Sequence, residues 1–103
     1  MLNQIVLVGR LTDNPTIKEL ESGKKVTSVT IAVPRSFKNE TGEYETDFIT
    51  CKLWDGIASS TTEYCRKGDI IGIKGRLQTY KVEDTYKQEV VAEKVTFLSS
   101  KAN

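Results

Sequence analysis

Aromatic rings and a lysine share alternate positions along one short stretch of this sequence, a combination suited to contact with flat, negatively charged molecules. The stretch FITCKLW has polar, basic or aromatic side chains at its even positions: Phe48, Thr50, Lys52 and Trp54. Its odd positions are apolar: Ile49, Cys51 and Leu53. A strand points alternate residues to opposite faces, so Phe48, Lys52 and Trp54 are predicted to face away from the core. Unpaired bases stack on such rings, and phosphates attract such cations.

Other rings and cations are predicted to lie on or beside this outward face. Phe37 and Arg35 extend the preceding strand beyond its core-facing run, and Tyr86 opens the last strand. The candidates for phosphate contact are Arg10, Arg35, Lys52, Lys74 and Arg76. Each stacked base contributes about 1–3 kcal/mol, so stacking can share the work of binding in a chain whose net charge is only +1.

Rings outside a core can also pack beneath loops or in subunit interfaces. Local packing is the role predicted for Tyr44, Tyr64 and Tyr80, and Phe97 is predicted to lie in the core. For Phe48 and Trp54, the face that they share with a lysine favours a functional role.

Catalytic and metal-binding patterns find no support in the sequence. The carboxylates between Glu40 and Asp47 lie in a polar hairpin, and the chain has no histidine. Its two cysteines, Cys51 and Cys65, have no metal-ligand or redox spacing and are predicted to be reduced, buried thiols. The sequence therefore predicts a protein that is not an enzyme and that binds no metal and no cofactor.

The elements that position these residues are mainly strands. Alternating or doubly apolar runs predict strands over residues 3–11, from residue 26 to the turn at 39–42, over 44–54, over 69–79 and over 86–98. The side chains predicted to face the core include Ile31, Leu53, Ile71, Ile73 and Leu77. A short helix is predicted after Trp54, with Asp55 as its N-cap and Arg66-Lys67-Gly68 as its end. A bulge is predicted near Glu93 and Lys94, where the alternation breaks.

This order of strands, with glycines at curved positions, predicts an all-β fold with one short helix. The expected architecture is a five-stranded barrel of the oligonucleotide-binding (OB) type, ordered β-β-β-α-β-β. At 103 residues the chain is predicted to form a single domain, 1–103, in which residues 98–103 are a short polar tail.

The chain resembles the bacterial and phage single-stranded DNA-binding protein (SSB) family along nearly its whole length. The segments that carry the resemblance are LNQIVLVGRLTDNP, TIAVPRSF, GEYETDFITCKLW, YCRKGDIIGIKGRLQT and EVVAEKVTFL. Their order, more than any single one of them, is specific to that family.

The resemblance implies an OB fold that assembles as a homotetramer, or at least as a dimer, and binds single-stranded DNA without strong sequence preference. It implies base stacking on Phe37, Phe48, Trp54 and Tyr86, with Tyr80 as the alternative to Tyr86 because the hairpin between them is shorter than usual. The implied role is protection of single strands in DNA replication, recombination and repair. The doubly apolar strand at residues 3–11 fits the expected pairing of subunits.

Family members usually continue into a flexible Gly/Pro/Gln-rich segment with an acidic tip that recruits replication and repair enzymes, whereas this sequence ends with SSKAN. Either that tail was removed or this is a member without one, so recruitment of replication or repair proteins stays open.

Two further expectations concern location and an alternative function. With no apolar run long enough for a membrane span and no secretion signal, the sequence predicts a cytoplasmic, nucleoid-associated protein without a membrane partner. The alternative function is that of an OB-fold adaptor in a primosome-like assembly, where the same surface binds protein.

Overall fold

The structure is a computed structural model, and residues 1–100 of the chain are described. Six strands and one helix follow one another along the chain: β1 (Ile5–Leu11), β2 (Lys18–Glu19), β3 (Lys25–Lys38), β4 (Tyr44–Trp54), α1 (Asp55–Tyr64), β5 (Ile70–Val82) and β6 (Thr85–Ser99). The order of the five long strands and the helix is the predicted one, and the two-residue β2 is an addition at the edge of β3.

One continuous sheet closes on itself to make the barrel. The strands lie in the order β1-β5-β6-β4-β3-β2, and β1 pairs with β3 as well as with β5. Closure therefore comes from β1, whose Arg10 and Leu11 lie opposite Ala32 and Ile31 of β3. This confirms the predicted five-stranded barrel with one short helix.

The core consists of the inward-facing residues of the long strands. Its largest fully buried side chains include Ile31, Leu53, Ile71 and Ile73. The alternation of apolar residues in the sequence identified all four. Two other residues predicted to face inward are partly exposed: 46% of Phe97 and 38% of Leu77. Leu77 lies beyond Gly75, where the pairing of β5 with β1 ends. Phe97 lies beside Tyr64 at the end of α1, with ring centroids 6.0 Å apart.

Asp55 does not cap the helix as predicted. It is the first residue of α1, where it has a φ of 49°, and the N-cap residue is Trp54, which has no side-chain capping bond. The Asp55 side chain instead accepts a hydrogen bond from the Lys25 backbone N–H at 3.1 Å. Asp55 therefore ties the start of the helix to the start of β3. The helix ends just before the predicted stop, because α1 finishes at Tyr64 with Cys65 as its extended C-cap. Gly68, with a φ of 93°, lies in the turn that follows.

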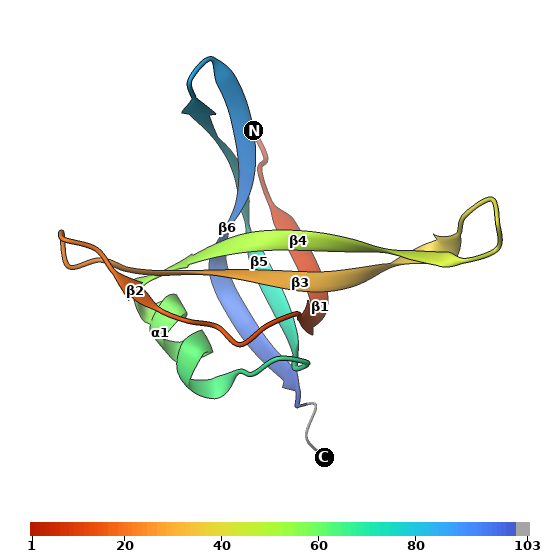
Figure 1. Ribbon diagram of the computed structural model, residues 1–103, viewed down its shortest axis with the longest axis horizontal. Helices are drawn as coiled ribbons and strands as arrows, with labels where there is room; N and C mark the ends of the chain where they lie inside the picture. The colour runs from red at the N-terminus through yellow and green to blue at the C-terminus, as the bar shows by residue number, and fades with distance from the viewer. Residues whose placement is uncertain (101–103) are drawn as a thin grey trace.

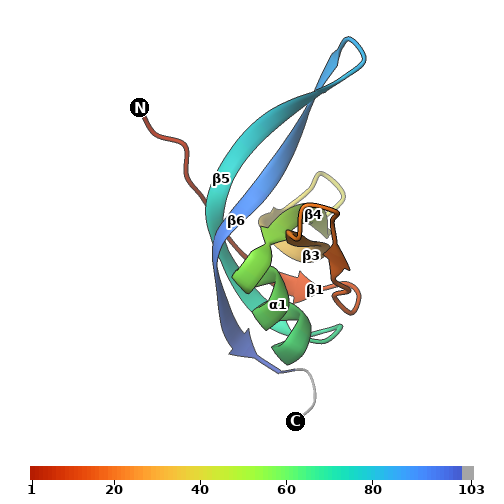
Figure 2. The ribbon, with the colours of Figure 1, turned by 90° about the vertical axis from the view of Figure 1, so that its left-hand side faces the viewer.

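Two hairpins extend beyond the barrel as arms. In Figure 1 the β3–β4 arm extends to the right and the β5–β6 arm extends upward. Figure 2 shows α1 at the end of the barrel opposite the tip of the β5–β6 arm. The molecule accordingly measures 49 × 43 × 26 Å. Both arms are hairpins, so the strands that form the barrel also carry side chains well outside it.

The predicted bulge is present in β6. Lys74 lies opposite Lys94, but the next residue of β5, Gly75, lies opposite Ala92, so Glu93 is the extra residue. The predicted polar tail begins later than expected, because β6 continues to Ser99, and residues 101–103 lie outside the described part of the chain.

Both cysteines are free and buried, as predicted. Burial raises the pKa of the Cys51 thiol to about 11, so this thiol is protonated at neutral pH. Among residues 1–100, no helix has the length and apolar character to cross a membrane.

Candidate nucleic-acid interface

The outer face of β3 and β4 carries the rings that the sequence singled out. Strand register places Phe48 opposite Ala32, Lys52 opposite Ser28 and Trp54 opposite Val26. Residues directly opposite each other in a sheet share a face. The Phe48 side chain is 68% exposed, whereas Trp54 is half-buried. The structure thus brings Phe48, Lys52 and Trp54 together on one face, opposite the core.

Two lysines lie close to the Trp54 ring. The Nζ atoms of Lys24 and Lys52 each lie 5.9 Å from the centroid of its ring, within reach of a cation–π interaction. Beside the ring is a hollow of about 450 Å³ whose lining includes Lys18, Ser28 and Lys52. Lys18 and Lys24 were missed by sequence reasoning. For Lys24 the signal was the SGKK turn, which the pairing of Val26 with Trp54 brings next to the ring. Lys18 reaches the same place because β2 pairs it with Val26, which no local pattern indicated.

The other two stacking candidates lie on the arms. Phe37 is exposed in the irregular stretch of β3 between Pro34 and Lys38. Tyr86 is exposed on β6, opposite Lys81 of β5, whose Nζ lies 5.6 Å from the ring centroid. Both rings are separated from the barrel face that carries Phe48, and each is open to solvent.

Lys52 and Arg76 belong to one chain of polar contacts across β4, β6 and β5. The Lys52 Nζ lies 3.5 Å from an oxygen of Glu89, and the other oxygen of Glu89 accepts a hydrogen bond from the Gln78 amide at 3.0 Å. Arg76 donates to the Gln78 side-chain oxygen at 3.1 Å and to Glu93 at 3.3 Å. Each of these two cations therefore has a carboxylate neighbour with which a phosphate would compete.

We expect replacement of Glu89 by Gln to strengthen binding of oligo(dT) severalfold. The amide keeps an oxygen for Gln78 but removes the negative charge beside Lys52, which frees that lysine for a phosphate. The measurement is the affinity at several salt concentrations, where an additional phosphate contact steepens the slope of log K against log[salt] by about 0.7. Glu83→Gln, in the β5–β6 turn, is the control for net charge, and an equal gain in both variants would contradict a specific role for Glu89.

Arg10 and Lys74 lie in different settings. Arg10 lies opposite Ala32, which in turn lies opposite Phe48, so Arg10 belongs to the same row of the outer face. Its guanidinium donates to the Gly68 carbonyl at 2.8 Å. Lys74 is exposed on β5 between Val6 of β1 and Lys94 of β6, away from the rings.

Arg35 is held by acidic side chains within the β3–β4 arm. Its Nε and Nη2 donate to the two oxygens of Asp47 at 3.1 and 2.9 Å, and Nη1 lies 3.4 Å from Glu45. Asp47 and Glu45 are odd positions of β4, on the face opposite Phe48. The hydrogen bond from Arg35 lowers the pKa of Asp47 below its ordinary value and raises that of Arg35. Arg35 is thus engaged as a clamp of the arm, and its contact with phosphate stays a prediction.

The Asp47 carboxyl is expected to titrate below its ordinary pKa of 3.8 in the intact protein. Because the folded-state pKa is lowered, the ion pair supports the arm fully above the ordinary value and is lost as the pH falls through the lowered one. Carboxyl chemical shifts followed from pH 6 to pH 2 measure this. In Arg35→Gln the pKa should return toward the ordinary value, and an unchanged titration would contradict the clamp.

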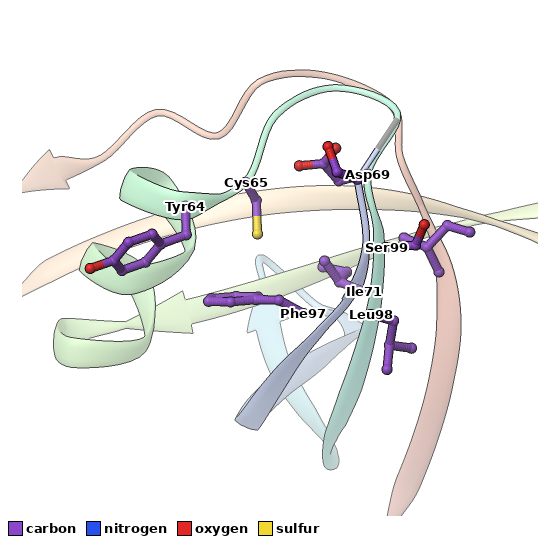
Figure 3. Close-up of a pocket in the computed structure, with 9 residues that line it drawn as sticks. Tyr64, Cys65, Asp69, Ile71, Phe97, Leu98 and Ser99 are labelled. Atoms are coloured by element: carbon purple, nitrogen blue, oxygen red, sulfur yellow. The ribbon is translucent and has the colours of Figure 1, made fainter. Parts of the chain in front are cut away.

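Local packing does not cover the three tyrosines for which it was predicted: Tyr44, Tyr64 and Tyr80 are all exposed. Tyr64 and Phe97 lie together beside a cavity of about 260 Å³ at the end of α1. Figure 3 shows the two rings with Cys65 and Asp69 on its wall. None of the candidate stacking or phosphate-contact residues lines this cavity.

Comparison with known proteins gives consistent matches over the length of the chain. The model of the Single-strand binding protein family matches residues 2–98. Single-stranded DNA-binding protein B of Bacillus subtilis is 44% identical, over 98% of this chain and 94% of that protein. Single-stranded DNA-binding protein 3 of Listeria innocua is also 44% identical, over all of this chain and 68% of that protein.

A solved structure described as a Plasmodium falciparum SSB complex with ssDNA has the same fold. It superposes with a TM-score of 0.82 at 28% identity and covers 96% of both chains. This agreement supports the OB barrel described above.

Proposed function

Because this chain belongs to the Single-strand binding protein family, we propose that it binds single-stranded DNA without strong sequence preference. The observation that carries the proposal is the face shared by Phe48, Lys52 and Trp54 opposite the core. There Phe48 is exposed, and Lys52 and Trp54 lie half-buried beside each other. Every base has a π-face that can stack on such rings, so binding of this kind tolerates any sequence.

In this proposal the bases stack on four rings, and the cations around the rings contact the DNA phosphates. The four rings are Phe37, Phe48, Trp54 and Tyr86. Lys52 is the central cation, because it lies beside Trp54 and borders the hollow next to that ring. Arg10 shares the row of Phe48, while Arg76 connects to Lys52 through Gln78 and Glu89. Lys74 and Arg35 contribute from outside this face. The biological role follows as coating and protection of single strands during replication, recombination and repair.

Self-association is part of the same proposal, with a homotetramer as the expected form. Val6 and Val8 on the outer face of β1 are 66% and 50% exposed. Two neighbouring apolar side chains left this open in the middle of a strand mark a surface that a partner can cover. A second copy placed on this strand would cover both. Linked sites on one assembly would then bind a single DNA strand with higher avidity than one chain does. A solution mass equal to one chain, measured by light scattering at micromolar concentration, would overturn this part.

The direct test of DNA binding is a titration with oligo(dT) followed by intrinsic fluorescence. Trp54 is the only tryptophan, so the signal comes from a proposed stacking residue. We expect strong, saturable quenching by oligo(dT) and a much weaker response to duplex DNA. A flat trace together with no shift in a mobility assay would overturn the proposal and favour an adaptor that binds protein through this surface.

A further inference from the structure

A ring outside the proposed stacking set lies at the far end of the β3–β4 arm. Tyr44 is the first residue of β4 and is 61% exposed. It lies opposite Lys38, the last residue of β3, and the Lys38 Nζ is 5.7 Å from the centroid of its ring. A flat, open ring with a cation beside it is thus present at the tip of the arm.

Tyr44 points to the same face as the rings of the barrel. It occupies an even position of β4, as do Phe48 and Trp54, and successive even positions share one face of a strand. At about 3.4 Å per residue, Tyr44 lies roughly 14 Å from Phe48 and Phe48 roughly 20 Å from Trp54. The three rings therefore form a row along one strand, which a single extended DNA strand can follow.

The pair of Tyr44 and Lys38 repeats an arrangement found twice among the stacking candidates. Lys81 lies opposite Tyr86 at the tip of the other arm, with its Nζ 5.6 Å from that ring. Lys52 lies 5.9 Å from Trp54. In each case a lysine stands within about 6 Å of the ring, where one nucleotide can place its base on the ring and its phosphate near the cation.

The arm holds this pair in place through bonds on its other face and in its turn. Arg35 bridges β3 to Asp47 and Glu45 of β4. In the turn, the Asn39 side-chain oxygen accepts hydrogen bonds from the backbone N–H groups of Thr41 and Glu43. An ordered arm loses less conformational freedom on binding, and so more of the contact energy appears as affinity.

We propose that Lys38 and Tyr44 form an additional nucleotide subsite, which extends the DNA path from Phe48 to the tip of the β3–β4 arm. The inference rests on the proposed binding of single-stranded DNA and adds a contact to it. Tyr44 supplies the stacking surface for a base, and Lys38 contacts the adjoining phosphate. The exposure of Tyr44 is thereby explained, which local packing does not do.

A tryptophan placed at position 44 tests base contact directly. Trp54→Phe keeps a ring at position 54 and removes the native fluorophore, so Tyr44→Trp in that background reports from the arm alone. We expect oligo(dT) to quench it saturably, in parallel with the mobility shift. Tyr64→Trp in the same background is the matched control, because Tyr64 is equally open, at 65%, but lies on α1 beside Phe97. If oligo(dT) quenches the tryptophans at positions 44 and 64 equally, or quenches neither, while the mobility shift is retained, the subsite is overturned.

Affinities of the single variants provide an independent measurement. Tyr44→Ala should weaken oligo(dT) binding by roughly 5- to 100-fold, whereas Tyr44→Phe should keep most of it, since the ring makes the contact. Lys38→Gln should reduce the salt slope by about 0.7. The subsite is overturned if Tyr44→Ala binds oligo(dT) with unchanged affinity. The proposed function stays intact in that case, provided that oligo(dT) quenches Trp54 in the unaltered protein. If the unaltered protein itself does not bind oligo(dT), both the subsite and the proposed function are overturned.

Discussion

Replacing Phe48 and Trp54 together by alanine is expected to weaken oligo(dT) binding by roughly 30-fold to 10⁴-fold. Each stacked base is worth about 1–3 kcal/mol, and tenfold in affinity corresponds to about 1.4 kcal/mol. The two rings lie six residues apart on β4, roughly 20 Å, so their contributions should add. Both point away from the core, so the barrel should survive their removal.

Binding by the double variant is measured by mobility shift, because the variant has no tryptophan. Thermal unfolding of the same preparation verifies that the barrel is intact. Tyr64→Ala is the control, since it removes an exposed ring from α1 that has no part in the proposed path. Affinity within twofold of the unaltered protein would refute stacking on the β4 face. The single variants Trp54→Phe and Phe48→Tyr should bind nearly normally, because each keeps a ring.

Gly75→Ala is expected to destabilise the barrel by about 3 kcal/mol, the upper part of the range for overpacking in a core. Gly75 lies opposite Ala92 next to the bulged Glu93, where β5 and β6 approach closely. A methyl group there would clash with the Val91 carbonyl oxygen and come within 3.1 Å of the Ala92 Cα. Because these are backbone atoms of a paired strand, they cannot move aside without breaking the ladder that joins the two strands.

Urea unfolding measures the effect as a fall in the midpoint with little change in slope. Gly56→Ala is the matched control, because a methyl group at this position of α1 has no neighbour within 4 Å. There alanine should stabilise the protein by about 0.5–1 kcal/mol, since it favours the helix. A Gly75→Ala midpoint equal to that of the unaltered protein would show that the two strands separate more easily than their geometry implies.

The arrangement of the barrel and its ring-bearing face followed from local patterns. Alternation along residues 49–53 identified Cys51 and Leu53 as core and Phe48 and Trp54 as outward, and the break near Glu93 marked a bulge. These features are predictable because a strand has a period of two, so burial of one face determines the direction of every side chain on it. The family resemblance followed from the same segments and agrees with the family match over residues 2–98.

Several sequence predictions were wrong near the ends of strands and of the helix. There the local spacing of residues persists although the tertiary surroundings change. Leu77 keeps the spacing of Ile71 and Ile73, but it lies beyond Gly75, where the pairing of β5 with β1 ends. Phe97 is apolar and lies in a strand, yet it meets Tyr64 at the rim. Asp55 was predicted to cap the helix, but it is the first helical residue and its carboxylate accepts a hydrogen bond from the Lys25 backbone N–H. In each case a neighbour distant in sequence decided the outcome.

The sequence by itself determined which residues share a face, because side-chain direction along a strand is a local property of the backbone. Only the tertiary structure decided which charges meet. It placed Lys24 beside Trp54, engaged Arg35 with Asp47, joined Lys52 to Glu89, and left Tyr44 open next to Lys38. Contacts of this kind depend on strand register and on the length of the hairpin arms. Register within a hairpin follows from its turn. Contacts between hairpins, such as that of Lys52 with Glu89, depend also on the parallel pairing of β4 with β6, which no short stretch of sequence contains.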